Sequence, residues 1–143
     1  MEKTQEEYDN LCDQKSSKEN EKVQVEGEIT SIDEQIETLQ AAYDDIDDAL
    51  EEIRDIRDKI KNTPNECIAK WEGQVAQAVF TSCESGDLYT SYQTYIDDID
   101  AVRDELNLKL TELENKRSEK YGILQGIISS LNDLWTSIQN YWN

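Results

Sequence analysis

The sequence predicts an all-α protein, a long antiparallel two-helix hairpin of the coiled-coil type. The first observation is composition: 33% of the 143 residues are charged, and the chain has only five glycines and one proline. Such a composition is typical of long amphipathic helices. The second is that apolar residues recur at alternating steps of three and four. The third is a group of helix-breaking residues near the middle, which divides the pattern into two halves of one domain, residues 1–143.

The first helix is expected over about residues 2–62. Its apolar residues form a heptad from Ile29 onward, which places them on one packed seam. Residues 13–22 contain no apolar side chain, and there the helix either continues or restarts at Ser16, which fits a capping box with Glu19. The helix should end near Pro64, because proline removes a helical hydrogen bond and disfavours helix in the residue before it. The seam residues are Ile29, Ile32, Ile36, Leu39, Tyr43, Ile46, Leu50, Ile53 and Ile60.

An elbow is expected at about residues 63–73, followed by a second helix over about 74–142 with a kink at 85–87. Trp71, Gly73 and Phe80 stand out in this region. A tryptophan at an elbow closes the end of the core, and a glycine relieves the turn. Because the link between the two long helices is short, they should be antiparallel neighbours.

The C-terminal segment, residues 121–143, carries one charged residue, Asp133, and has a wide apolar face. The segment opposite it in an antiparallel hairpin, roughly residues 1–18, is poor in apolar residues. We therefore expect the last turns, with Ile138, Tyr141 and Trp142, to overhang the first helix and to leave apolar surface uncovered. Another helical protein, a second copy or a frayed end would each account for such a surface. The predicted partner-binding residues are Leu124, Ile127, Ile128, Leu131, Leu134, Trp135, Ile138 and Trp142.

The charge of the chain argues against several classes of partner. There are 33 acidic and 14 basic residues, and the formal net charge is -19. No basic stripe exists to neutralise nucleic-acid phosphates, and the charge disfavours anionic membrane surfaces. No apolar run approaches the length that spans a membrane, so no membrane insertion is expected. The first residues show no signal peptide, so we expect a protein made in the cytoplasm which, if co-secreted, leaves without a cleaved leader.

Catalysis and metal binding are not expected. The chain has no histidine, no glycine-rich phosphate loop and no nucleophile elbow. Its three cysteines, Cys12, Cys67 and Cys83, match no metal motif in number or spacing and are interpreted as half-buried thiols. The acidic clusters at residues 44–48 and 97–100 favour a solvated face over a calcium site, because no calcium-binding loop is present. We therefore expect a non-enzymatic protein without a cofactor.

Trp71, Gly73 and Phe80, on a helix–elbow–helix pattern that covers the whole chain, resemble the Trp-x-Gly (WXG) superfamily of type VII secretion. The chain is longer than typical members and is more similar to the extended helical partners of LXG polymorphic toxins. The resemblance implies a chaperone-like targeting factor that binds the N-terminal helical domain of an LXG toxin, with or without a second small helical protein. The superfamily's export signal pairs an aromatic residue with an acidic one four positions later. Tyr43 with Asp47 and Phe80 with Glu84 match its letters, but not its usual C-terminal place.

Two other functions remain open at this stage. A structural coiled-coil homodimer would form a stable, well-folded dimer by itself. An acidic immunity or inhibitor protein would bind the catalytic part of a basic toxin, with strong sensitivity to salt.

Overall fold

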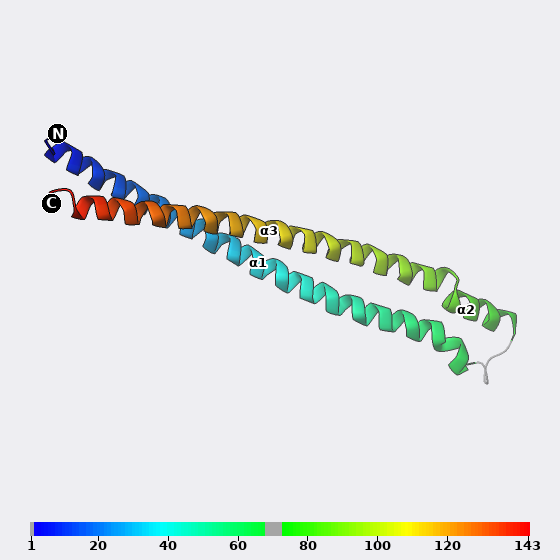
Figure 1. Cartoon of the computed structure of the whole chain (residues 1–143). Coiled ribbons are helices and arrows are strands. Elements are labelled where there is room, and N and C mark those ends of the chain that lie inside the picture. The colour runs from blue at the N-terminus through cyan, green and yellow to red at the C-terminus, as the bar shows by residue number, and fades with distance from the viewer. Residues whose placement is uncertain (1, 68–72) are drawn as a thin grey trace. The chain divides into compact units, whose positions relative to one another are not determined.

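The computed structural model describes residues 2–67 and 73–143, and residues 65–67 by their backbone alone. It contains α1 (Gln5–Cys67), α2 (Gln74–Glu84) and α3 (Asp87–Gln139), and the described residues include no strand (Figure 1). The prediction of an all-α helical hairpin is confirmed. Trp71 and the thiol of Cys67 lie outside the described residues and side chains.

α1 ends later than the sequence indicates. It runs through residues 13–22 without a restart, and it continues past Pro64 to Cys67, whereas an end near residue 62 was expected. Proline in a helix removes the hydrogen bond to the carbonyl four residues earlier. Pro64 is buried, however, and lies in the last turn. Apolar burial of its ring therefore offsets the loss of one backbone bond at the helix end.

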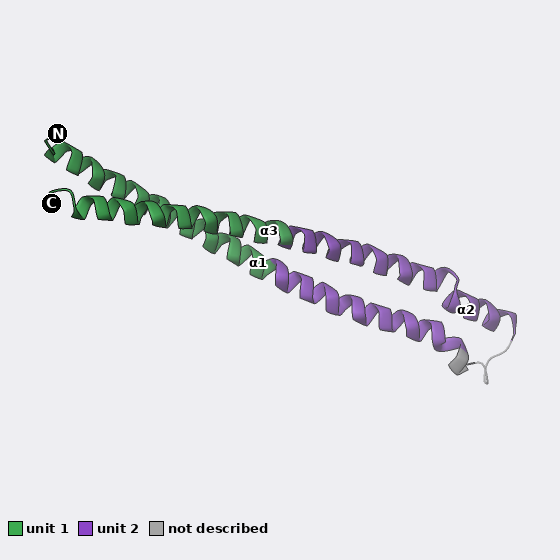
Figure 2. Cartoon of the chain, in the orientation of Figure 1, with its two compact units in different colours: residues 1–38, 111–143 green, residues 39–110 purple. Residues whose placement is uncertain are grey.

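The chain divides into two compact units (Figure 2). Unit 1 comprises Met1–Thr38 and Thr111–Asn143, and unit 2 comprises Leu39–Leu110. Each unit contains one segment of α1 and one of α3, which run in opposite directions, and unit 2 also contains α2.

Within each unit, the buried and half-buried residues of both helices follow a heptad, with the seam at positions a and d. In unit 1 the α1 seam residues are Tyr8, Leu11, Lys15, Lys18, Lys22, Val25, Ile29, Ile32 and Ile36, and the C-terminal ones are Leu113, Arg117, Lys120, Leu124, Ile127, Leu131, Leu134, Ile138 and Tyr141. In unit 2 they are Leu39, Tyr43, Ile46, Leu50, Ile53, Arg57, Ile60 and Pro64 from α1, with Tyr89, Tyr92, Ile96, Ile99, Arg103, Leu106 and Leu110 from α3. Because the paired segments are antiparallel, their e positions share one flank of the seam and their g positions share the other.

Two glycines mark the bounds of α2. Gly73 is its N-cap and has a φ of 113°, a conformation that L side chains rarely adopt. Gly86 lies between α2 and α3, and a Cβ there would stand 2.8 Å from the Cα of Ser82. The amide of Gly86 donates to the carbonyl of Thr81 at 2.8 Å. This close approach of backbone to backbone fits only glycine, and it lies within the region where the sequence analysis expects a kink.

No helix in the described part of the chain is both long and apolar enough to cross a membrane.

Candidate protein-binding site

The core of unit 1 uses part of the predicted partner-binding face. Val25 and Ile29 of α1 pack with Leu124 and Ile127 of α3 into one buried cluster, and Ile128 and Leu131 lie against it. The C-terminal segment offers two apolar lines one position apart. The line through residues 124, 127, 131, 134 and 138 lies on the seam, and Val25 and Ile29 of α1 pack against its first members.

The expectation that the eight partner-binding residues form uncovered surface is therefore wrong in part. Leu124, Ile127 and Ile138 are buried inside unit 1. Three more, Ile128, Leu131 and Leu134, are half-buried. Only Trp135 and Trp142 are largely exposed.

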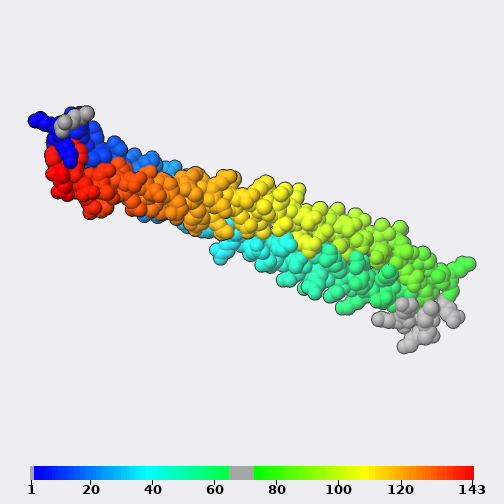
Figure 3. All heavy atoms as spheres, in the orientation of Figure 1, coloured from blue at the N-terminus to red at the C-terminus, as the bar shows by residue number. Residues whose placement is uncertain are grey.

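The last turn does not overhang α1, contrary to the expectation from the sequence. The Tyr141 hydroxyl donates to a carboxylate oxygen of Glu7 at 2.5 Å and accepts from the amide of Thr4 at 3.0 Å. The ring of Tyr8 lies 5.8 Å from the rings of both Tyr141 and Trp142. In the space-filling view the first and last residues of unit 1 form one continuous surface (Figure 3). We call this group of residues, Thr4, Glu7, Tyr8, Tyr141 and Trp142, the terminal clasp.

The terminal clasp also changes the acidity of its two titratable groups. The hydrogen bond from Tyr141, together with that from the Thr4 amide, holds the pKa of Glu7 below its ordinary value of 4.5. Partial desolvation and the bond to Glu7 raise the pKa of Tyr141 above its ordinary value of 10.0. The neutral phenol and the ionised carboxylate are thus the forms that this geometry favours.

Three lysines occupy the α1 seam where the sequence shows no apolar residue. Lys15, Lys18 and Lys22 continue the spacing that leads to Val25, and each forms an ion pair with a glutamate three or four residues later. The ammonium of Lys15 also lies 5.4 Å from the ring centroid of Trp135. Lysine stems cover apolar surface while their charges stay in water. The spacing of 15, 18 and 22 was the available signal, but sequence reasoning based on apolar residues missed it.

Most of the large exposed side chains of the C-terminal segment form one line, and Ile123 lies on the other flank. The members of the line stand seven residues apart at the e position of α3 and the turn beyond it. Tyr121 is 46% exposed, Trp135 50% and Trp142 56%, and Ile128 is half-buried. We call these four residues the C-terminal stripe. Sequence reasoning left out Tyr121, although the seven-residue spacing that ends in two tryptophans indicates it.

The α1 segment contributes acidic residues to the same flank as the C-terminal stripe. Its e positions there are Glu19, Glu26 and Asp33. Asp33 accepts a bond from Arg117 at 3.2 Å. The candidate site therefore has an apolar floor on α3 and a polar, acidic edge on α1, which suits a helix with an apolar face.

The described part of the elbow motif lies in and beside α2. Phe80 is buried in unit 2 along with Ala76 and Cys83, and Gly73 caps the helix. Trp71, as noted, lies outside the described residues.

The two sequences that match an export signal have different surroundings. Tyr43 is a half-buried seam residue and Asp47 is paired with Arg103 at 2.6 Å, while Phe80 is buried and Glu84 is the exposed last residue of α2. The role of either pair as a signal stays a prediction.

Among the residues that the structure describes, no group of three or more cysteine or acidic side chains is placed to hold a metal ion. Cys12 is a half-buried free thiol and Cys83 a buried one. The two acidic clusters meet at Arg103, which pairs with Asp47 at 2.6 Å and with Asp100 at 2.5 Å.

Comparison with known proteins places the chain in one family. Neither a curated protein nor a solved structure matches it. The family model described as YwqH-like matches residues 13–136, which is most of the chain and includes seam residues of both units. The protein therefore belongs to the YwqH-like family.

Proposed function

We propose that this protein is a non-enzymatic, chaperone-like partner of an LXG-type toxin. It would bind the toxin's N-terminal helical domain and help to target it for export by a type VII secretion system. The YwqH-like family is associated with LXG toxin systems, and the chain is a small helical member of it. The part of the proposal that concerns type VII secretion rests on the resemblance of Trp71, Gly73 and Phe80 to the Trp-x-Gly superfamily.

The C-terminal stripe is the observation that carries the proposed contact. Burial of a large apolar side chain contributes about 1.5–3 kcal/mol. Tryptophan and tyrosine are also the side chains that most often anchor interfaces. Tyr121, Trp135 and Trp142 are about half exposed on one flank of unit 1, where a further helix would cover them.

The proposal includes no catalysis and no cofactor. The stripe is apolar, and the polar groups nearest to it are already paired: Lys15 with Glu19 at 2.5 Å, and Arg117 with Asp33 at 3.2 Å. Such a surface recognises shape and apolar area. Export of this chain itself, and a second small helical protein in the complex, belong to the same proposal.

The proposal is tested by co-expression of the tagged chain with an LXG toxin N-terminal domain from the same host. We expect a stable complex by affinity purification and size-exclusion chromatography. Trp135→Ser should reduce recovery of the toxin domain by more than about tenfold, because it removes a central aromatic anchor.

The matched control is Ile123→Ser. Ile123 is 49% exposed, like Trp135, and lies in the same segment of α3 at a g position, on the other flank. If both substitutions reduce recovery equally, the C-terminal stripe is not the contact. A lone homodimer, or a complex with only the toxin's catalytic part that dissociates in high salt, would replace the proposal with one of the two other functions.

A further inference from the structure

Unit 2 has an apolar flank of its own, and it lies at the g positions of its helices. On α3, Leu88, Tyr95 and Val102 stand seven residues apart, and Tyr95 is 57% and Val102 47% exposed. On α1 the g positions of unit 2 are Ala42, Ala49, Ile56 and Thr63, and Ile56 is also exposed. The six apolar residues among these g positions form an apolar floor along one side of unit 2, and Lys109 continues the row on α3.

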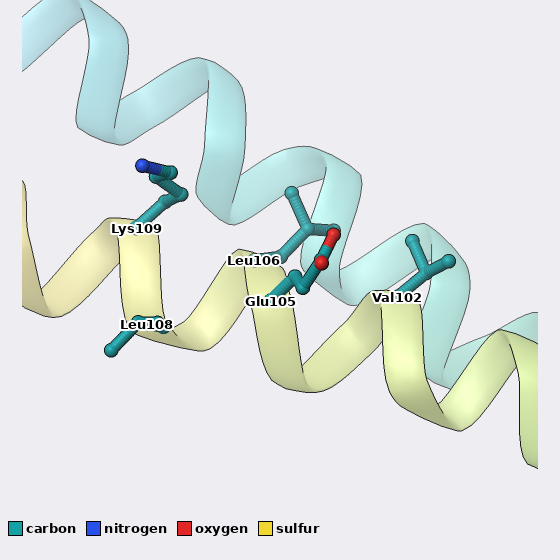
Figure 4. A pocket seen from close by; sticks show the side chains of 5 residues that line it. All are labelled: Val102, Glu105, Leu106, Leu108 and Lys109. Carbon is teal, nitrogen blue, oxygen red and sulfur yellow. The ribbon is translucent and has the colours of Figure 1, made fainter.

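On and beside this side, the surface of α3 has three shallow hollows, over residues 90–98 and 102–109. One hollow of about 400 Å³ is lined by Val102, Glu105, Leu106, Leu108 and Lys109, and Figure 4 shows these side chains with α1 behind them. A second, of about 390 Å³, is lined by Ser91, Tyr92 and Tyr95. A third involves Tyr95 and Asp98. We call this floor with its hollows the central groove.

The opposite flank of unit 2 is closed by polar contacts. Arg103 pairs with Asp47, Arg54 lies 3.9 Å from Asp100, and Arg57 donates to Gln93 at 2.8 Å. Every one of these contacts includes a residue at an e position. The charges that join α1 to α3 in unit 2 therefore lie away from the central groove.

Carboxylates without partners border the central groove on both sides. Position c lies next to g on a helix. There α1 carries Asp45 and Glu52, followed by Lys59, while α3 carries Ser91, Asp98 and Glu105, so the four carboxylates lie along the part of the groove beside Ala49 and Val102. All four are exposed, and in the part of the chain that the structure describes none of them forms an ion pair or a side-chain hydrogen bond. At the e positions of the other flank, by contrast, Asp47 and Asp100 are both paired with Arg103.

We propose that the central groove is a docking site for an amphipathic helix of another protein, with lysine or arginine on both sides of its apolar face. An apolar floor between two rows of free carboxylates is complementary in charge to that helix and to few others. A second copy of this chain is a poor occupant, because it would bring a further formal charge of -19. This inference goes beyond the proposed function, since it concerns unit 2 and does not depend on the C-terminal stripe.

The probe is a fluorescein-labelled synthetic helix of about 21 residues, three heptads, with leucines on one face and lysines on either side of them. A matched peptide carries glutamate in place of every lysine. Fluorescence anisotropy with the full chain should show saturable one-to-one binding of the lysine peptide only, weakened as salt rises.

Two double variants locate the binding. Tyr95→Ser with Val102→Ser removes the apolar floor and should weaken binding by more than about tenfold. Asp98→Asn with Glu105→Gln removes the border charges of α3 and should weaken it by about fivefold, with a smaller salt dependence.

The control removes the same amount of charge from the same helix one position earlier. Asp97→Asn with Asp104→Asn changes b positions, which lie away from the groove, and should alter the affinity by less than about twofold. Circular dichroism confirms that each variant is folded. A larger loss of peptide binding in Trp135→Ser than in the Tyr95 and Val102 double variant would assign the peptide to the C-terminal stripe and overturn the proposal.

Equal weakening by the two acidic double variants would overturn the proposal, because binding would then be diffuse attraction to an acidic chain. Full affinity after loss of Tyr95 and Val102 would overturn it as well. The proposal would also be overturned if the lysine peptide did not bind. It would be overturned as well if sedimentation showed a dimer of this chain and hydrogen exchange showed that the dimer protects this flank.

Discussion

Units 1 and 2 are built on the same heptad, but they leave opposite flanks apolar. In unit 2 the e flank holds Arg54 and Asp100, and the g flank holds the central groove. In unit 1 the e flank holds the C-terminal stripe, and the g position Glu28 pairs with Lys120 at 2.5 Å. Because two helices pack along one seam only, each unit has two flanks that its own helices do not bury. Unit 2 thus joins its helices by charged contacts on the e flank, whereas in unit 1 the exposed apolar side chains of α3 share the e flank with Asp33 of α1, which is paired with Arg117.

The seams of the two units differ as well. Leu50, in unit 2, is fully buried, whereas the first turns of α1 in unit 1 place Lys15, Lys18 and Lys22 on the seam. Leu131 and Leu134 of the C-terminal segment are accordingly only half-buried. We infer that the C-terminal end of unit 1 is held less tightly by its own hairpin than the middle of unit 2.

The largest effect is expected from truncation of the two seams. Leu50→Ala should lower the free energy of unfolding by about 3 kcal/mol, since it removes a fully buried side chain and leaves a cavity. Leu131→Ala should cost about 1 kcal/mol, because that side chain already meets water. Urea titrations followed by circular dichroism measure both. Equal losses would show that the lysine seam packs as well as the leucine seam, and the contrast between the units would fail.

A smaller effect of opposite sign is expected from repair of the lysine seam. Lys18→Leu should raise the free energy of unfolding by about 1 kcal/mol, because an apolar side chain at a d position packs better against the C-terminal segment. Its ion pair with Glu21 is exposed and contributes little. Glu19→Leu, at an e position, serves as the control for added apolar surface alone. Destabilisation by Lys18→Leu would mean that the lysine charges, rather than their stems, hold this end.

The fold class could be predicted from the sequence because it depends on periodicity alone. The alternating spacing of three and four residues can be recognised wherever leucine and isoleucine occupy the seam, as from Ile29 to Ile60. It is hidden where Lys15, Lys18 and Lys22 take the same positions, since a lysine shows whether it lies on a seam only through its surroundings. The end of α1 was misplaced because proline disfavours a helix interior, whereas burial of the Pro64 ring, which depends on tertiary packing, offsets the lost backbone bond.

The eight predicted partner-binding residues come from two faces of one segment, and whether they bind a partner stays a prediction. Residues 121–142 contain two apolar lines one position apart, and periodicity cannot rank them. Only the residues of α1 opposite, such as Val25 and Ile29, decide that Leu124 and Ile127 turn inward while Trp135 remains exposed. The central groove escaped prediction because its floor includes alanines and lies beside the acidic clusters, where a solvated face is the ordinary reading.

The smallest effect is expected at the terminal clasp. A substitution there tests how the two chain ends are attached to each other without changing the buried seam. Tyr141→Phe keeps the ring beside Tyr8 and Trp142 but removes the bonds to Thr4 and Glu7, so hydrogen exchange in residues 5–12 should quicken while global unfolding hardly changes.

The effect of Tyr141→Phe on hydrogen exchange should depend on pH, and the direction follows from the pKa shifts of Glu7 and Tyr141. The pKa of Glu7 is lowered on folding, so its contribution is complete above its ordinary value of 4.5 and disappears as the pH falls through the folded pKa. The pKa of Tyr141 is raised, so its contribution is complete below 10.0 and disappears as the pH rises through the folded pKa. The difference in hydrogen-exchange protection of residues 5–12 between the wild type and Tyr141→Phe should therefore be constant between about pH 5 and 9. It should become smaller below and above that range. Glu7→Gln should abolish the acid limb and weaken the alkaline limb, because the bond to Glu7 also raises the pKa of Tyr141. If the difference in protection does not vary with pH, the protection comes from ring stacking rather than from the hydrogen bonds of Tyr141. The two chain ends would then be held together by apolar contact, as the seam is.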